Sequence, residues 1–299
     1  MAAPDDRQPL LLSVDFEDWH QLVRRRVGAS DWEQPGPALG RQTDALLDRF
    51  DELGVRATFF VLGLAARSHP HLVEQLVERG HEIGCHGDRH QLVHGQTQPE
   101  FAADLQAACR TIASLTGRRP AGYRAPAFSI TRDCQWAYDV LVDEGFEYDS
   151  SQHDSPRIRG RVVPSQTEPH RLELSQGSLW EFPVAVWRSG GRRVPVGGAS
   201  YWAVLPTGLV LRGLESVGRY GALYLHPYEL DPEPLRARLP GYAPRSARVH
   251  GRLRAAQRNL ARRRAPGVLH AIARRYRLIP YGEAHALLSG RAPAGTEPV

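Results

Sequence analysis

Residues 54–63 have the sequence GVRATFFVLG, and this stretch decides the fold. Its centre, Ala57–Val61, is rich in aromatic and β-branched residues and predicts a buried strand. The preceding segment, Thr43–Leu53, has apolar residues at helical spacing and is followed by a glycine, a residue typical of helix ends. A second helix at His69–Arg79 and a second strand at Glu82–His86 follow. This alternation predicts repeated βα units around a mostly parallel sheet or barrel.

The same alternation continues on both sides of this stretch. Upstream, Leu10–Asp15 is an apolar run that ends in acidic residues and predicts another buried strand. Downstream, we predict helices at Pro99–Leu115 and Thr131–Glu144 and extended segments at Gly122–Arg124, Leu179–Phe182 and Ala222–His226. The polar stretch His153–Gln176 predicts a long surface loop. Helical patterns end the chain, at Ala247–Arg264, Val268–Tyr276 and Tyr281–Leu288.

These patterns predict four parts of the chain. Residues 1–9 form an N-terminal tail, and residues 10–231 form the main α/β domain. Residues 232–290 form an arginine-rich, mostly helical extension that packs on this domain. Residues 291–299, rich in proline and glycine, form a disordered tail.

Composition excludes several classes of protein. Apolar and charged residues make up 41% and 24% of the 299 residues, as in ordinary globular domains. No apolar run approaches the ~20 residues that a membrane span needs, and the acidic N-terminus does not resemble a signal peptide. We therefore expect no membrane span and a cytoplasmic location. The three cysteines form no CxxC pair, which favours buried, reduced thiols.

The sequence pI near 9.4 raises the question of a nucleic-acid partner. All 38 basic side chains are arginine, and the net charge is only +5. This pattern indicates a coding bias more than a phosphate-binding face. The arginines of Ala247–Arg264 are scattered and fit no nucleic-acid-binding motif, so we interpret them as an exposed helical face and predict no nucleic-acid partner.

Polar residues stand at the ends of four predicted strands: Asp15, His86, Arg124 and His226. In a parallel α/β fold the carboxyl ends of the strands meet at one rim, where active sites form. For Arg124 alone a surface turn is the simpler interpretation, and for His226 alone a hydrogen-bonded core histidine is. Their common position at strand ends favours a shared site.

Two further patterns indicate a divalent metal ion. His86 and His90 are spaced i, i+4, which places two imidazoles on one side of a turn. The segment Asp15-Phe16-Glu17-Asp18 places three carboxylates within four residues, and these repel one another unless a cation compensates them. Each pattern alone also fits a solvated loop or an acidic turn. Together they favour a catalytic metal site with two histidines and one carboxylate.

Six motifs occur in a fixed order along the chain: SVDFEDWH, GVRATFFVLG, GHEIGCHGDRH, GYRAPAFSIT, GFEYDSS and LYLHPYELD. Together they resemble the polysaccharide deacetylase family, which has the NodB homology domain and is related to carbohydrate esterase family 4. The branch associated with exopolysaccharide and exosortase loci is the most similar. The resemblance is dense from Leu10 to Asp231 and weaker to about Leu288.

This resemblance implies an α/β fold, a distorted (β/α) barrel with fewer than eight repeats. It implies a metal-dependent hydrolase that removes N-acetyl groups from the amino sugars of a polysaccharide or oligosaccharide. Asp15 is then the general base, Arg124 orients it, and His226 is the general acid. Asp149 is the carboxylate that orients the arginine or the histidine. A backbone N–H near Ala127 is implied to stabilise the oxyanion.

The resemblance further implies a divalent ion held by His86, His90 and a carboxylate of the first motif. The family has two adjacent aspartates there, whereas this chain has Glu17 and Asp18 after Asp15. On an extended strand residues i and i+2 point the same way, which favours Glu17 over Asp18 as the ligand. Zinc suits this donor set best, with cobalt, nickel or iron(II) as substitutes.

Several alternatives stay open. An allantoinase-like enzyme that hydrolyses cyclic amides or ureides would need the same metal site, and a non-catalytic glycan-binding protein could keep the fold. The sequence leaves the glycan and the oligomeric state open. Four aromatic residues suit either stacking on sugar rings or packing at the mouth of the barrel: Trp19, Tyr123, Trp202 and Tyr228.

Overall fold

The computed structural model describes residues 5–154 and 166–291. Nine strands form one sheet in the order β10-β1-β2-β3-β4-β5-β7-β6, with β11 also paired to β1. Their bounds are β1 Pro9–Phe16, β2 Thr58–Val61, β3 Glu82–Cys85, β4 Gly122–Tyr123, β5 Tyr148–Asp149, β6 His170–Leu174, β7 Gly177–Glu181, β10 Ala222–Leu225 and β11 Arg277–Ile279. A separate antiparallel hairpin joins β8 (Val186–Ser189) and β9 (Arg192–Pro195).

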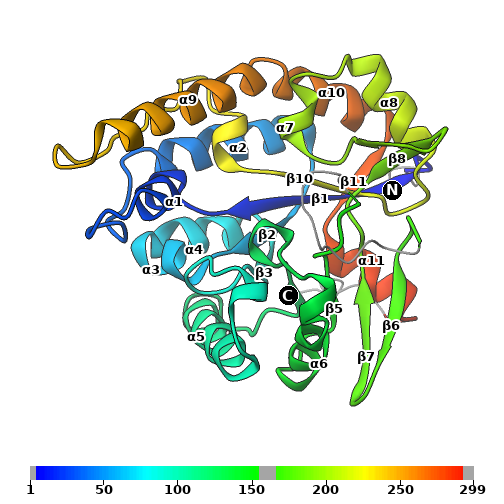
Figure 1. Cartoon of the computed structure of the whole chain (residues 1–299). Helices are drawn as coiled ribbons and strands as arrows, with labels where there is room; N and C mark the ends of the chain where they lie inside the picture. The colour runs from blue at the N-terminus through cyan, green and yellow to red at the C-terminus, as the bar shows by residue number, and fades with distance from the viewer. Residues whose placement is uncertain (1–4, 155–165, 292–299) are drawn as a thin grey trace.

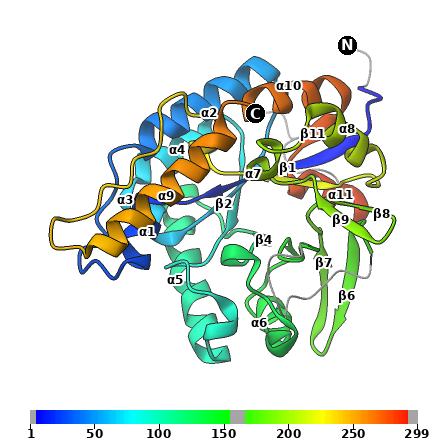
Figure 2. The ribbon, with the colours of Figure 1, turned by 45° about the horizontal axis from the view of Figure 1, so that its top comes forward.

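Helices surround this sheet, with α2, α9 and α10 on one side of β1 and α5 and α6 on the opposite side (Figures 1 and 2). Their bounds are α1 Trp19–Arg26, α2 Leu39–Leu53, α3 Gly63–Ser68, α4 Pro70–Glu78, α5 Gln98–Thr116, α6 Trp136–Asp143, α7 Ala199–Trp202, α8 Thr207–Glu215, α9 Arg245–Arg262, α10 Ala265–Arg275 and α11 Tyr281–Leu288. Short 3₁₀ turns at Pro126–Phe128 and Pro227–Glu229 follow β4 and β10.

The predicted α/β class is confirmed, and β1 is the centre of the sheet. Every residue of β1 is buried, and the strand pairs in parallel with β10, β2 and β11. Apolar helix faces cover the sheet, as where Phe50 of α2 meets Phe59 of β2 with ring centroids 6.2 Å apart. Burial on both faces explains why β1 is an almost continuous apolar run in the sequence.

The strands of the described residues do not form a continuously paired, closed barrel. Strands β10 and β6 are the two edges of the sheet. Isolated bridges link Val184 to Ala222 and Gly198 to Tyr224, which brings the chain after β7 back to β10 without a continuous ladder. Strands β4 and β5 have only two residues each, and β6 is antiparallel to β7. These short and reversed strands leave too few parallel pairs to close a barrel.

The predicted elements agree with the structure where the periodic pattern is long. The stretch His153–Gln176 is the main error, because its residues 170–174 form β6 and pair with β7. The helix predicted at Thr131–Glu144 begins instead as a 3₁₀ turn at Arg132–Cys134. The predicted tail from 292 onward lies outside the described residues. All three cysteines are buried and free.

The last strand and helix belong to the same core as β1. Strand β11 pairs with the first half of β1, on the side where β2 pairs with its second half. The chain then turns into α11, where Tyr281 N donates to Thr58 Oγ1 at 2.8 Å and Gly282 N donates to the buried Glu82 at 2.8 Å. The predicted division at residue 231 stays a prediction. No helix in the described ranges has the length and apolar character that a membrane span requires.

Candidate functional site

Four strand ends deliver polar side chains to one rim of the sheet. Asp15 lies in β1, and His86, Arg124 and His226 directly follow β3, β4 and β10. A cavity of about 610 Å³ opens at this rim, and Asp15, Glu17, His86, His90 and His226 are among the residues that line it. The topology thus gathers residues that are up to 211 positions apart in the chain into one site.

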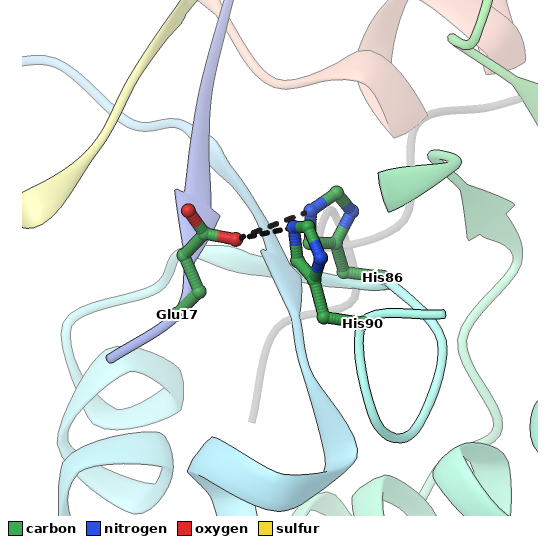
Figure 3. Close-up of side chains that lie close together, drawn as sticks. All are labelled: Glu17, His86 and His90. Atoms are coloured by element: carbon green, nitrogen blue, oxygen red, sulfur yellow. Dashed lines mark ion pairs between the residues drawn. The ribbon is translucent and has the colours of Figure 1, made fainter. Parts of the chain in front are cut away.

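Glu17, His86 and His90 converge on one point of this cavity (Figure 3). Glu17 Oε2 lies 3.0 Å from His90 Nε2 and 3.7 Å from His86 Nε2. The candidate ligand atoms of the three residues lie within 4.8 Å of one another. This spacing suits one ion bound by two imidazoles and a carboxylate.

The hydrogen bonds of the cluster also favour a cation. His86 Nδ1 lies 2.8 Å from the carbonyl oxygen of Arg124, which can only accept, so Nδ1 carries the proton and Nε2 presents a lone pair to Glu17. Glu17 Oε2 is buried and has no hydrogen-bond partner of proper geometry among the described residues. Lone pairs that meet in a buried site repel each other unless a positive charge lies between them. The donor set therefore fits a divalent ion.

Burial raises the pKa of Glu17, but the imidazoles of His90, His226 and His86 offset this and lower the pKa to about 2. Glu17 is therefore ionised at neutral pH, the state that a metal ligand requires. Burial lowers the pKa of His86, which keeps its imidazole neutral and able to bind a metal ion.

The loop after β3 holds the two histidines in place. Gly87 has φ +76°, and a Cβ there would lie 2.7 Å from Asp104 Oδ2, so only glycine fits. His90 has φ +54°, an uncommon backbone for a residue with a side chain. Arg25 of α1 donates to the carbonyl oxygens of Arg89 and His90. The strained His90 is thus fixed from outside, as at many functional sites.

Asp18 lies close in sequence but serves a different purpose. Its carboxylate accepts from His20 N at 2.8 Å and Gly36 N at 2.5 Å, and it caps the N-terminus of α1. It is not part of the Glu17–His86–His90 cluster. The chain therefore turns after Glu17. Of the carboxylates of Glu17 and Asp18, that of Glu17 lies beside His86 and His90.

Arg124 is completely buried beside Asp15. Its Nη1 donates to Asp15 Oδ1 at 2.8 Å and to Ser13 Oγ at 2.7 Å. Its Nε and Nη2 donate to the carbonyl oxygen and hydroxyl of Ser150 and to the Tyr281 hydroxyl, at 3.1, 2.8 and 2.7 Å. Burial lowers the pKa of Arg124, but Tyr281 and Asp15 more than offset this and raise it. Asp15 therefore faces a permanent, fixed positive charge.

His226 has a carboxylate partner, but that partner is Glu229. Glu229 Oε2 lies 3.3 Å from His226 Nδ1 and accepts from the backbone N of His226 at 2.8 Å. Burial lowers the pKa of His226, but Glu229, then Glu17 and Asp15, offset this and raise it above its usual value. The imidazole also stacks on Tyr228, with centroids 5.0 Å apart.

Asp149, which the resemblance implies to orient the arginine or the histidine, lies on the Arg124 side of the site. Its carboxylate accepts from the backbone N and hydroxyl of Ser151, at 3.0 and 2.6 Å. The same hydroxyl accepts from Ala125 N at 2.8 Å. Asp149 thus fixes the backbone next to Arg124 through Ser151. Glu229 follows His226 by three residues in a tight turn. It is therefore the carboxylate that contacts the His226 ring.

The contacts of Glu229 extend into the arginine-rich helix α9. Ser200 of α7 donates to Glu229 Oε1 at 2.7 Å, and Arg258 donates to Ser200 Oγ at 2.7 Å. Burial raises the pKa of Glu229, but His226 and Arg258 offset this and lower it. The interpretation of this helix as a merely exposed face is therefore incomplete, because Arg258 lines the cavity.

The four aromatic candidates divide into two pairs. Tyr123 and Trp202 are buried in the main core, and the packing interpretation holds for them. Trp19 and Tyr228 line the cavity. Ala127, whose backbone N–H the resemblance singled out, also lines the cavity and has φ +52°.

The sequence did not reveal the residues that support this site: Ser13, Ser150, Ser200, Glu229, Arg258 and Tyr281. Glu229 had a local signal, because an acidic residue three positions after His226 fits a capping box. The others approach from distant elements. Tyr281 is 157 residues from Arg124, and no local pattern marks such a contact.

Fold and site together define an α/β protein with a candidate metal centre at the carboxyl ends of parallel strands. Residues 35–141 match the family model described as Polysaccharide deacetylase, and residues 151–263 match a domain of unknown function, DUF3473. Residues 35–141 are therefore similar to polysaccharide deacetylases.

Two curated proteins share this similarity over part of their length. A peptidoglycan deacetylase-like protein of Gibberella zeae is 32% identical over 152 residues, 48% of this chain and 44% of the relative. A peptidoglycan deacetylase of Helicobacter pylori is 30% identical over 106 residues, 36% of this chain and 35% of the relative. The chain thus spans less than half the length of these curated relatives.

The fold is also found among solved structures. A Mycobacterium smegmatis protein described as a polysaccharide deacetylase has a TM-score of 0.62 and 20% identity, covering 100% of this chain and 97% of that one. At this identity the likeness concerns the fold alone.

Proposed function

We propose that this protein is a metal-dependent deacetylase that removes N-acetyl groups from the amino sugars of a polysaccharide or oligosaccharide. One observation carries the proposal: the buried Glu17 carboxylate meets the histidines of the GHEIGCHGDRH motif beside the Asp15–Arg124 pair. Hydrolysis of an acetamide needs a metal site and a general base that lie close together. The relatives reported above are named as a peptidoglycan deacetylase-like protein and a peptidoglycan deacetylase, which supports an N-acetylated glycan as substrate.

In this proposal Glu17, His86 and His90 hold zinc, with cobalt, nickel or iron(II) as substitutes. The ion supplies Lewis acidity towards the amide and activation of water. Asp15 takes the proton of the attacking water. Arg124 holds its Oδ1, which leaves Oδ2 for that proton.

The remaining steps use groups on the other walls of the cavity. The backbone N–H near Ala127 stabilises the developing oxyanion. His226, whose pKa Glu229 raises, gives its proton to the departing amine, so that water and the amide yield acetate and an amino sugar. Asp149 positions the backbone beside Arg124 through Ser151. The exopolysaccharide context stays a prediction.

Acetate release tests this proposal. The purified protein is stripped with a chelator, restored with zinc, and incubated with N-acetylated oligosaccharides and, separately, with allantoin. We expect acetate from the oligosaccharides only after zinc is restored. Ring opening of allantoin without acetate release favours the cyclic-amide alternative. A protein that binds the oligosaccharides but hydrolyses neither substrate is a glycan-binding relative.

A further inference from the structure

Two helices face each other across the mouth of the cavity and line it with arginine. Arg25 and Arg26 come from α1, and Arg254 and Arg258 come from α9. Both views show these two helices close together at one end of the molecule (Figures 1 and 2). The carboxylates in the lining are Asp15 and Glu17, which lie at the floor. The mouth is therefore positively charged.

Two of these arginines have structural partners. Arg25 donates to the backbone of the His90 loop and stacks over Trp32, with its guanidinium carbon 5.1 Å from the ring centroid. Arg258 donates to Ser200 in the Glu229 network. These contacts explain why Arg25 and Arg258 lie beside the cavity.

Arg26 and Arg254 have no such partner. Among the described residues no carboxylate lies within ion-pair distance of either guanidinium, whereas the neighbouring Arg24 pairs with Asp31. Arg254 Nε meets only His250 Nε2, at 3.1 Å. Burial and the charges of Arg26 and Arg258 lower the pKa of Arg254, so these guanidinium groups lie close enough to repel one another.

A favourable helix end does not explain this arrangement. Arg26 lies in the last turn of α1, where a cation gains from the helix dipole. Arg254 lies in the middle of α9, where the dipole gives no such gain. Arg26 is exposed and Arg254 is partly exposed, so an anion that binds between them would gain from both charges.

We infer that the substrate is an anionic glycan, in which a carboxylate or phosphate next to the reacting N-acetyl sugar binds Arg26 and Arg254. Guanidinium groups match both oxyanions with paired N–H donors. The inference rests on the proposed function, because it takes the floor of the cavity as the place of the N-acetyl group. It adds the charge of the substrate, which the deacetylase family alone does not define.

Calorimetric binding to the 299-residue chain tests the inference. The carboxylate probe is a tetrasaccharide of alternating glucuronate and N-acetylglucosamine, and its matched neutral form is the methyl ester. The phosphate probe is N-acetylglucosamine 1-phosphate, with N-acetylglucosamine as its neutral form. We expect at least one anionic probe to bind on the order of tenfold tighter than its neutral form, and the preference to shrink at high salt.

The double variant Arg26→Gln, Arg254→Gln should lose most of this preference and keep its binding of the neutral forms. Arg252→Gln is the matched control, because Arg252 is exposed on the same helix and does not line the cavity. Equal binding of charged and neutral probes by the wild type overturns the inference. A preference that survives the double variant, or that falls equally in Arg252→Gln, also overturns it. Arginine-dependent binding of an oligonucleotide in place of both saccharide probes has the same consequence.

Acetate release from the same probes separates this inference from the proposed function. An anion preference that depends on Arg26 and Arg254, without acetate release, supports the binding site and contradicts the deacetylase. Acetate release from charged and neutral probes with equal affinity supports the deacetylase and overturns the anionic substrate.

Discussion

Asp15 and Glu17 stand two residues apart at the end of β1, and their surroundings differ in kind. Asp15 faces a buried arginine, whose Nη1 lies 2.8 Å from its Oδ1. Glu17 faces three imidazoles, with Nε2 atoms of His90, His226 and His86 at 3.0, 3.6 and 3.7 Å. Asp15 thus has its counter-charge within the protein and needs no bound cation. The buried Glu17 carboxylate meets imidazole nitrogens and is suited to bind a cation together with them, so the same strand end supplies two different chemical roles.

The largest effect is expected on the Glu17 side. His86→Ala or Glu17→Ala should remove the bound divalent ion, because a catalytic site needs three protein ligands. Affinity should fall by more than ~100-fold, since even residues that only orient ligands cost ~10–100-fold. Elemental analysis and zinc titration measure this effect. His94→Ala, at an exposed histidine of the following turn, is the control and should keep the ion.

On the Asp15 side, Asp15→Asn should keep the ion and lose most activity. An amide cannot take the proton from water, and loss of a general base costs ~10²–10⁴ in rate. The measurement is acetate release at full metal occupancy. Near-normal turnover in this variant would move the base to another residue and remove the distinction between the two carboxylates.

A smaller effect should appear in the pH profile. His226 acts as an acid only while protonated, so activity falls as pH rises through its pKa, which Glu229 raises. Glu229→Gln removes this charge, lowers the pKa of His226 and should shift the alkaline limb to lower pH. Asp149→Asn is the matched comparison and should leave this limb in place, since Asp149 binds Ser151. A shift in Asp149→Asn alone would contradict the assignment.

The smallest effect concerns Asp18, the remaining carboxylate of the first motif. Asp18→Ala should destabilise the fold by about 1 kcal/mol through loss of the cap of α1, with metal content unchanged. Thermal unfolding and elemental analysis of the same sample check both parts. If Asp18→Ala loses the ion and Glu17→Ala keeps it, the strand-end geometry is wrong and Asp18 is the ligand.

The sequence predicted the parts of the fold with a strong periodic pattern. Apolar spacing predicted the long helices and the strands β1, β2 and β3. The carboxyl ends of β1 and β3 position Asp15 and His86. Short strands were harder to predict, because β11 has three residues and is defined only by its pairing with β1. The open sheet depends in the same way on pairing between distant segments.

For the site, the sequence predicted the side chains at the strand ends but not the residues that support them. The i, i+2 rule placed Glu17 correctly among the histidines, because β1 stays extended to Phe16. The resemblance left open whether Asp149 orients the arginine or the histidine, and the carboxylate at His226 is Glu229, which a tight turn brings close. Contacts such as Arg124 with Tyr281 depend on how the chain ends pack, which local sequence does not specify.

The central claim is that Glu17, His86 and His90 hold an ion on which deacetylation depends. The direct test is to titrate zinc into metal-stripped protein and to measure bound zinc and acetate release in the same samples. We predict that activity rises in proportion to bound zinc and reaches its maximum at about one ion per chain, and that His86→Ala, His90→Ala protein gains neither. Full activity in the stripped protein, or zinc-dependent activity in the double variant, would contradict the claim.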